Sequence, residues 1–446
     1  MLGGVLYEPF GPLRQWTWGN SAVAVRTHDL DGNVTQIDSG GDFYQYTFDN
    51  AFRVTGISNA SDTALTWGYG YDSLDRLTGA TSTPRSESFS YDANGNRTSE
   101  SGSAAGVPFS NTVAVSGTSN RLTSISGSRS NVYGYDNAGH VLTETNTGRP
   151  VGISSTTTVS YLYNALSQRI WKSGPTSATY FVYDEAGHLL GEYGSGGTLI
   201  QETVWLGDTP VATLRPHAGG GVDIYYVHTD HLDTPRKVSR PSDNALVWRW
   251  DPSPFANAVP NENPQGVGAF RYNLRYPGQY YDTESGLSYN YSRDYDPAIG
   301  RYIESDPIGL DGGINTYAYV GGNPLSYSDP TGLAPPGRTH PGTGFPGLGV
   351  PGPYDEDWAK ARDAAALKLE EWINQAVNTV RNWCSDDEDD GTMLAEQETL
   401  TAAEEAAIRD RAAGKPVDEA TYNRARQKQI KNEKYNKQRN KRKRGG

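Results

Sequence analysis

The sequence predicts a mainly β protein built from an array of short hairpins, followed by a small α-helical C-terminal segment. Its 446 residues include 51 Gly, 26 Pro and 29 Tyr, whereas only 35% are hydrophobic and 20% charged. A helical bundle would contain more Leu, Ala, Lys and Glu than this. Gly supplies the positive φ that tight turns need, and Tyr suits a half-buried pleated surface. A phrase that begins with Tyr-Asp also recurs through the first half of the chain, and the composition changes after Leu333.

The recurring phrase is Tyr-Asp, a small polar pair, Gly or a substitute, Arg or His, and an apolar pair. Copies begin at Tyr71, Tyr91, Tyr135, Tyr163 and Tyr183, with weaker copies at His28 and Phe48. Asp followed by Asn or Gly favours a hairpin turn, and the alternating residues on either side supply two short strands. Repetition of this kind indicates an array in which each unit buries its apolar face against its neighbours. We expect the tyrosines to pack structurally, with ligand binding as the alternative.

These units resemble the Tyr-Asp repeats of the Rhs/YD-repeat family of polymorphic toxins. The block from Tyr226 to Arg236 is similar to a family block that reads His-Thr-Asp-His-Leu-Gly-Thr-Pro, with Asp233 where Gly is usual, and 275–333 resembles the Rhs-associated core. The resemblance implies a long β-sheet wound into a hollow, cocoon-like shell. Four regions are expected: a repeat shell segment over 1–270, the core over 271–333, a Pro/Gly linker over 334–353 and a variable helical tail over 354–446.

The core contains two Asp-Pro-x-Gly-Leu sequences, which begin at Asp306 and Asp329. Each is a good turn sequence, so two plain turns are one interpretation. In the other, the two carboxyl groups face each other, share a proton and act as an acid–base pair, as in an aspartic protease. The family resemblance implies self-cleavage after the second motif, at Leu333–Ala334. Arg301 is expected to hold a carboxylate or stabilise developing charge; its alternative is a structural ion pair with Asp296 or Glu304.

No metal or cofactor is expected from the sequence. His228, Asp230 and His231 have ligand-type side chains, but successive residues of a strand face opposite sides of a sheet, so the two histidines, three residues apart, would not share a face. We therefore expect a buried turn network there rather than a metal site. The single cysteine, Cys384, excludes internal disulfides and Cys-rich zinc sites.

The tail after Leu333 differs from the rest of the chain. Residues 334–352 are rich in Pro and Gly, which is typical of a linker. Apolar residues at three- and four-residue steps then predict an amphipathic helix from about Asp357. From Thr421 to Gly446 there are eleven Lys or Arg and one acidic residue, although the whole chain carries a net charge of −13. This basic stretch could bind nucleic-acid phosphates or form a solvated helix. Its candidate contact residues are Arg424, Arg426, Lys428, Lys431, Lys434, Lys437 and Arg439.

The family resemblance implies the C-terminal part of a toxin used in bacterial competition, with an incomplete shell around an effector that self-cleavage releases. Implied partners are a cognate immunity protein and a secretion-apparatus tip or adaptor. The first residues show no signal-peptide pattern, and the sequence contains no run of about 18 apolar residues that would span a membrane. We therefore expect synthesis in the cytoplasm and secretion or surface display by another route. The alternative is a non-enzymatic surface or adhesion protein that binds carbohydrate through exposed aromatic residues.

Overall fold

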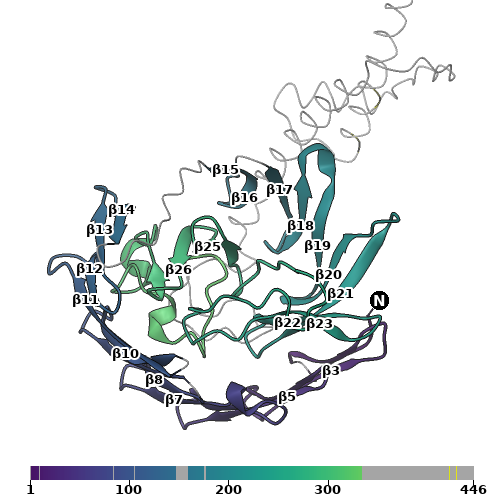
Figure 1. Ribbon diagram of the computed structural model, residues 1–446, viewed down its shortest axis with the longest axis horizontal. Coiled ribbons are helices and arrows are strands. Elements are labelled where there is room, and N and C mark those ends of the chain that lie inside the picture. The colour runs from purple at the N-terminus through teal and green to yellow at the C-terminus, as the bar shows by residue number, and fades with distance from the viewer. Residues whose placement is uncertain are drawn as a thin grey trace, which may run out of the picture. The chain divides into compact units, whose positions relative to one another are not determined.

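The computed structural model describes residues 2–333, apart from 10, 84, 105, 147–158 and 175–176, together with Thr421 and Lys428. Contacts divide the chain into two compact units, Met1–Lys360 and Ala361–Gly446. The first unit contains three antiparallel sheets of 14, 9 and 4 strands (Figure 1). This confirms the mainly β architecture, whereas the expected linker and helical tail lie outside the described residues.

The first sheet is a meander in which each strand pairs with the strand before it and the strand after it. Its strands are β1 (Gly3–Tyr7), β2 (Leu13–Thr17), β3 (Val23–His28), β4 (Val34–Ser39), β5 (Asp42–Phe48), β6 (Val54–Asn59), β7 (Trp67–Tyr71), β8 (Leu77–Thr81), β9 (Ser86–Tyr91), β10 (Arg97–Ala104), β11 (Val107–Val115), β12 (Leu122–Gly127), β13 (Asn131–Tyr135) and β14 (Val141–Asn146). A short 3₁₀ turn, η1 (Thr63–Leu65), connects β6 to β7.

The second sheet is also a sequential meander, and the third contains the core. The second comprises β15 (Ser160–Tyr163), β16 (Arg169–Ser173), β17 (Ala178–Tyr183), β18 (Leu189–Gly194), β19 (Leu199–Leu206), β20 (Thr209–Pro216), β21 (Val222–Thr229), β22 (Pro235–Arg240) and β23 (Ala245–Arg249), with η2 (Ser195–Gly197) between β18 and β19. The third comprises β24 (Tyr280–Asp282), β25 (Leu287–Asn290), β26 (Arg293–Asp296) and β27 (Arg301–Tyr302), followed by η3 (Gly309–Gly312) and η4 (Val320–Gly322). In Figure 1 the first sheet curves, and β25 and β26 lie on its concave side.

The Tyr-Asp repeats form the hairpin turns, and the Asp side chain closes each turn from within. At Asp72, one carboxylate oxygen accepts the backbone N–H groups of Leu74 and Arg76 at 2.9 and 3.0 Å, and the other accepts Nε of Arg76 at 2.7 Å. The guanidinium of Arg76 lies 4.9 Å from the ring centroid of Tyr91, the tyrosine of the next repeat. Tyr91 in turn donates its hydroxyl to the backbone oxygen of Leu77 at 2.8 Å. The repeat sequence therefore specifies both the turn and its contact with the next hairpin.

Replacing the turn carboxylate should destabilise the first sheet. Asp72→Ala removes three hydrogen bonds, one of them to a charged group, so we expect a loss of about 2 kcal/mol in the free energy of unfolding. Urea unfolding followed by circular dichroism measures this. Asp31→Ala is the matched control, because Asp31 is an exposed residue of an equivalent turn and only its backbone N–H is bonded to the turn carboxylate. Equal losses in the two variants would contradict this account of the turn.

Buried polar contacts join the first sheet to the second. Asp233, which occupies the family's usual Gly position, has a φ of +61°, and its carboxylate accepts hydrogen bonds from Arg26 and Thr209, each at 2.7 Å. Arg26 and Asp233 are both buried. Trp18 donates its indole N–H to the backbone oxygen of Val211 at 3.0 Å. The Asp233 side chain therefore provides a contact between sheets that Gly could not make.

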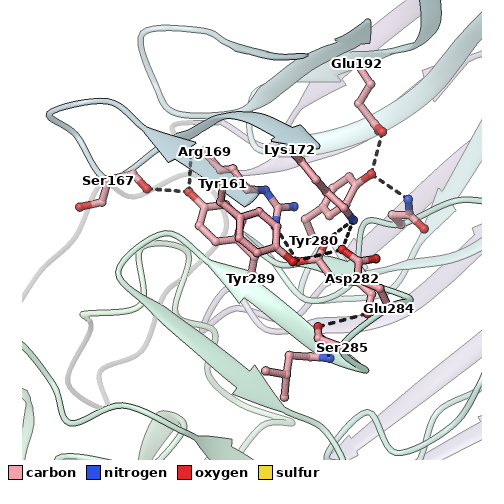
Figure 2. Close-up of polar contacts among 12 residues, drawn as sticks. Tyr161, Ser167, Arg169, Lys172, Glu192, Tyr280, Asp282, Glu284, Ser285 and Tyr289 are labelled. Carbon is pink, nitrogen blue, oxygen red and sulfur yellow. Dashed lines mark hydrogen bonds and ion pairs between the residues drawn. The ribbon is translucent and has the colours of Figure 1, made fainter. Parts of the chain in front are cut away.

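A second buried network joins the second sheet to the third (Figure 2). Arg169, which is 1% exposed, donates to Asp282 at 2.5 Å, and Lys172 bridges Asp282 and Glu284 at 2.8 and 2.5 Å. Four aromatic rings surround the Arg169 guanidinium, among them that of Tyr289 at 4.5 Å. Since Tyr289 belongs to β25, this network attaches that strand to the second sheet.

Candidate functional site

Asp306 and Asp329 each begin a turn in the core. Asp306 accepts the backbone N–H of Ile308 at 3.0 Å, and Asp329 accepts that of Leu333 at 3.1 Å. Gly309 and Gly332, the fourth residues of the two motifs, have φ values of +62° and +69°. Both sequences therefore form turns, as the turn interpretation predicts.

The two turns also bring their carboxyl groups to a common partner, Arg293. Its Nη2 atom lies 2.9 Å from Oδ2 of Asp306 and 3.3 Å from Oδ2 of Asp329. All three residues are buried, with exposed fractions of 4% for Arg293, 5% for Asp306 and 0% for Asp329. Arg293 is the first residue of β26, and its guanidinium therefore lies within ion-pair distance of both carboxyl groups.

Neighbouring residues orient Asp329. The Tyr302 hydroxyl donates to Oδ2 of Asp329 at 2.7 Å, and the side-chain amide of Asn290 donates to the Asp329 backbone oxygen at 2.9 Å. The same amide reaches the Tyr302 hydroxyl at 2.8 Å. The Arg293 guanidinium also lies 3.7 Å from the centroid of the Tyr302 ring. The Tyr302 bond holds the Asp329 carboxylate, and the Asn290 bond holds its backbone.

The environment of the Asp306 carboxyl group shifts its pKa upward. Burial raises its pKa above the usual range, and this effect outweighs the opposing charge of Arg293; the nearby Asp329 carboxylate raises the pKa further. Asp329 accepts hydrogen bonds at both of its carboxylate oxygens, from the backbone N–H of Leu333 and the hydroxyl of Tyr302. The two carboxyl groups therefore have different hydrogen-bond donors.

The chain just before the Leu333–Ala334 bond is held by the same residues. The N–H of Leu333 is bonded to Asp329, and the backbone oxygen of Gly332 accepts Nε of Arg293 at 2.5 Å. The Leu333 carbonyl carbon is therefore two covalent bonds from an atom in contact with Asp329. Ala334 itself lies outside the described residues.

Crowding at Gly332 provides a test of this placement. A Cβ atom there would lie 2.2 Å from the backbone oxygen of Asn290, so Gly332→Ala must displace the segment. If the bond after Leu333 is cleaved here, we expect the cleavage rate to fall by roughly a hundredfold, because misplacement by about 1 Å has that effect. Gly309→Ala is the control, since Gly309 has a similar φ of +62° and a Cβ there would have nothing within 4 Å. A time course of intact mass measures both, and unchanged cleavage in Gly332→Ala would contradict the expected register.

Arg301 does not occupy the position expected for it. Its Nη2 atom donates to the backbone oxygen of Asn120 at 2.6 Å, and its guanidinium lies 4.9 Å from the centroid of the Tyr317 ring. Arg301 therefore anchors the core to the first sheet, and Arg293 holds the carboxyl groups. The expectation failed because of the strand register. Arg301 begins β27, which pairs with β26, and it is Arg293 of β26 that reaches Asp306.

Two further acidic residues flank the site. The backbone N–H of Asp294 donates to Oε2 of Glu304 at 2.8 Å. Burial and the Asp294 carboxylate raise the pKa of Glu304 to about 8, and burial together with Asp282 raises the pKa of Asp294 to about 6, against the opposing charge of Arg169. At neutral pH Glu304 is thus largely protonated.

The raised pKa of Glu304 predicts a pH dependence of stability. Because the folded chain binds this proton more tightly than the unfolded chain, the contribution is complete below the ordinary pKa of 4.5 and is lost as pH rises through about 8. We expect the free energy of unfolding to fall over this window and Glu304→Gln to flatten the decline. Urea titrations across the window measure it, with Glu185→Gln, at an exposed position, as the control. A profile unchanged in Glu304→Gln would contradict the assignment.

His228, Asp230 and His231 form a buried hydrogen-bond network. The two ring nitrogens of His228 lie 2.8 Å from the hydroxyls of Ser39 and Ser239. Nε2 of His231 lies 2.8 Å from the backbone oxygen of Leu325, and Asp230 closes its turn as the other repeat carboxylates do. Across the described part of the chain, no group of three or more His, Cys, Asp or Glu is arranged to hold a metal ion.

Most of the candidate nucleic-acid contacts fall on residues that are not described. These are Arg424, Arg426, Lys431, Lys434, Lys437 and Arg439; among the candidates, only Lys428 belongs to the described part.

No helix in the described part is both long and apolar enough to cross a membrane.

Comparison with known proteins relates the chain to a group of bacterial proteins. No family model matches. The chain is 44% identical over 117 residues to toxin protein Tse5 of Pseudomonas aeruginosa, and 41% identical over 125 residues to double-stranded DNA deaminase toxin A of Burkholderia cenocepacia. It is 34% identical over 178 residues to the probable deoxyribonuclease RhsA of Dickeya dadantii. The matched segments make up 26%, 28% and 39% of this chain.

These matches support the resemblance to the Rhs/YD-repeat family. The chain spans only 8%, 8% and 12% of the lengths of these three proteins. The crystal structure of TcdB2–TccC3–TEV has the same fold over 75% of this chain and 19% of the other, with a TM-score of 0.59 and 18% sequence identity. The Photorhabdus luminescens Tc holotoxin pore matches over the same shares, with a TM-score of 0.56 and 18% identity. At this identity the likeness concerns the fold alone.

Proposed function

We propose that this chain is part of an Rhs-type toxin whose β-shell encloses an effector and which cleaves itself between Leu333 and Ala334. The observation that supports self-cleavage best is Arg293, which lies within 3.3 Å of both Asp306 and Asp329 while its Nε atom holds the backbone of Gly332. Two plain turns would not need a shared buried guanidinium. A buried Arg between two carboxyl groups is costly unless it is fully paired, as it is here.

In the proposed reaction, Asp329 is the base and Asp306 the acid. The Asp329 carboxylate takes a proton from water, whose oxygen forms a bond to the Leu333 carbonyl carbon. Asp306 gives its proton to the Ala334 nitrogen, and the carbon–nitrogen bond breaks. The products are a carboxyl group on Leu333 and a free amine on Ala334, and the proton that Asp329 took from water is returned to Asp306 or released to solvent. Arg293 positions both carboxyl groups and balances the charge that develops between them.

The intact mass of the purified chain tests this proposal. We expect two products that meet at Leu333–Ala334. A single full-length mass after prolonged incubation would exclude self-cleavage and favour the adhesion alternative, since a binding protein has no need to release a segment.

The toxin half of the proposal draws on the relatives. One of them is named a toxin, one a DNA deaminase toxin and one a deoxyribonuclease, so we propose use in bacterial competition and a cognate immunity protein as partner. The basic residues from Arg424 to Arg439 are proposed to contact nucleic-acid phosphates. Induction of the wild-type chain in a bacterium without an immunity protein should lower colony counts, and lysine-to-glutamine changes at Lys431, Lys434 and Lys437 should restore them. Normal growth with full expression would count against an active effector.

A further inference from the structure

A groove of about 590 Å³ lies between the first and second sheets. The first sheet contributes the η1 turn, Trp67 of β7 and the turn between β8 and β9. The second sheet contributes Leu246 and Arg249 of β23, and the segment after β23 contributes Ala258, Val259, Asn261, Pro264 and Gln265. None of the lining residues belongs to the site around Arg293, so the groove is a separate feature of the molecule.

Two lining residues of the first sheet, Trp67 and Arg85, come from the same end of neighbouring strands. Trp67 lies beside Ser82 in the register of β7 and β8. The backbone N–H of Ser82 in turn donates to the backbone oxygen of Arg85 at 2.7 Å. Neighbouring strands are about 4.8 Å apart, so the backbones of Trp67 and Arg85 are separated by about 10 Å. An aromatic side chain and a cation therefore line the groove within reach of one small molecule.

Arg85 has no carboxylate partner in the described part of the chain. Its side chain makes a single hydrogen bond among these residues, a long one of 3.4 Å from Nη1 to the backbone oxygen of Asp251. That bond places the guanidinium at the groove, because Asp251 lines the groove as well. A guanidinium has five N–H donors in a fixed fork that matches a carboxylate. Most of the Arg85 donors are therefore available to a ligand.

The two carboxylates of the lining, on Asp62 and Asp251, are already paired. Both bind Arg249, whose Nη2 atom lies 3.1 Å from Asp62 and whose Nε atom lies 2.5 Å from Asp251. Glu87 also interacts with the charge of Arg85, but it lies outside the lining, and burial raises the pKa of its carboxyl group. The paired charges balance one another, so Arg85 gives the lining an excess positive charge.

Trp67 supplies a ring surface beside this cation. Its indole plane lies within 3° of the Tyr69 ring, and the two ring centroids are 6.1 Å apart, so Tyr69 covers one face of the indole. The indole N–H has no acceptor among the residues that the structure describes, and it is not a fully buried atom. A ligand ring would stack on the other face of the indole, and the N–H adds a second free donor.

We propose that this groove binds a flat ring that carries a carboxylate. The ring stacks on Trp67, and the carboxylate accepts hydrogen bonds from the Arg85 fork. A neutral ring would leave that fork without an acceptor, so the charge is part of the recognition. Aromatic acids and uronic acids both have this chemistry. The proposal does not depend on self-cleavage.

Calorimetry and ligand-observed NMR on the full chain test the proposal, with benzoate, glucuronate and benzamide as probes. We expect benzoate or glucuronate to bind at millimolar concentration or below, and the stronger binder identifies an aromatic acid or a uronic acid as the ligand source. Benzamide, which has the ring of benzoate without the charge, should bind at least tenfold more weakly than the stronger acid. Arg85→Gln should weaken binding of that acid at least tenfold, and Arg85→Lys should weaken it less.

Arg121→Gln is the matched control. Arg121 also donates to one backbone oxygen, at 3.3 Å, and lies beside an aromatic ring of the first sheet, but it is not part of the groove, so both acids should bind this variant as they bind wild type. Ser82→Trp fills the groove between Trp67 and Arg85 and should abolish binding while the melting temperature stays within a few degrees of wild type. The proposal is overturned if neither acid binds wild type, if benzamide binds as tightly as the stronger acid, or if Arg85→Gln binds that acid as well as wild type does.

Discussion

The Asp329→Asn variant should stay full length under conditions in which the wild-type chain is cut after Leu333. Asn keeps the size of the side chain and can still accept the N–H of Leu333, but it cannot take a proton from water. We expect the cleavage rate to fall by roughly a thousandfold, which is within the range for a general base. The measurement is intact mass over a time course after purification, with N-terminal sequencing of any released fragment. Asp306→Asn should have the same effect, since it removes the proposed acid.

The buried carboxylate Asp282 provides a control for this experiment. It belongs to the network around Arg169, away from the Leu333 contacts, so Asp282→Asn should destabilise the fold and still permit cleavage. Cleavage that persists in both Asp329→Asn and Asp306→Asn would rule out the proposed pair and leave the two motifs as turns. Cleavage lost in all three variants would instead indicate a general folding defect.

The Arg293→Met variant should show the largest loss of stability. Met has similar length but leaves Asp306 and Asp329 buried without their shared cation, and breaking such a buried pair has a cost of about 3–5 kcal/mol. Because the same side chain holds the backbone of Gly332, we expect cleavage to be lost as well. Urea unfolding measures the first effect and intact mass the second.

Two further variants separate folding from positioning. Arg293→Lys keeps the charge but cannot reach both carboxyl groups and Gly332 together, so it should retain more stability than Arg293→Met and still cleave slowly. Arg301→Met removes another buried arginine, which contacts Asn120 rather than the carboxyl groups, so it should lose stability and keep cleavage. Full cleavage in Arg293→Met would show that this residue has no part in the reaction.

The repeat turns could be predicted from the sequence because their interactions are local. Asp72 and Arg76 are four residues apart, and the hydrogen bonds between them close the turn whatever surrounds it. The same holds for the turns at Asp306 and Asp329, where Pro and Gly set the backbone conformation. The meander follows in turn, since consecutive hairpins pair with their neighbours.

Arg293 was missed because its role depends on contacts between distant residues. It precedes Asp306 by 13 residues and Asp329 by 36, and only the packing of β26 against both turns brings them together. One signal was available: Arg293 shares the strand face of the fully buried Tyr295, where an arginine requires buried carboxylates.

The strictly consecutive strand order also determines how the molecule can be assembled. Each hairpin of the first two sheets needs only the residues just before it, so these sheets can form step by step as the chain emerges from a ribosome or a narrow conduit. Contacts such as Arg26 to Asp233, 207 residues apart, must wait until both sheets exist. The pairing of Asp306 and Asp329 at Arg293 comes later still, because it needs the last described turn. Formation of this carboxylate pair therefore marks the completion of the core over the described residues.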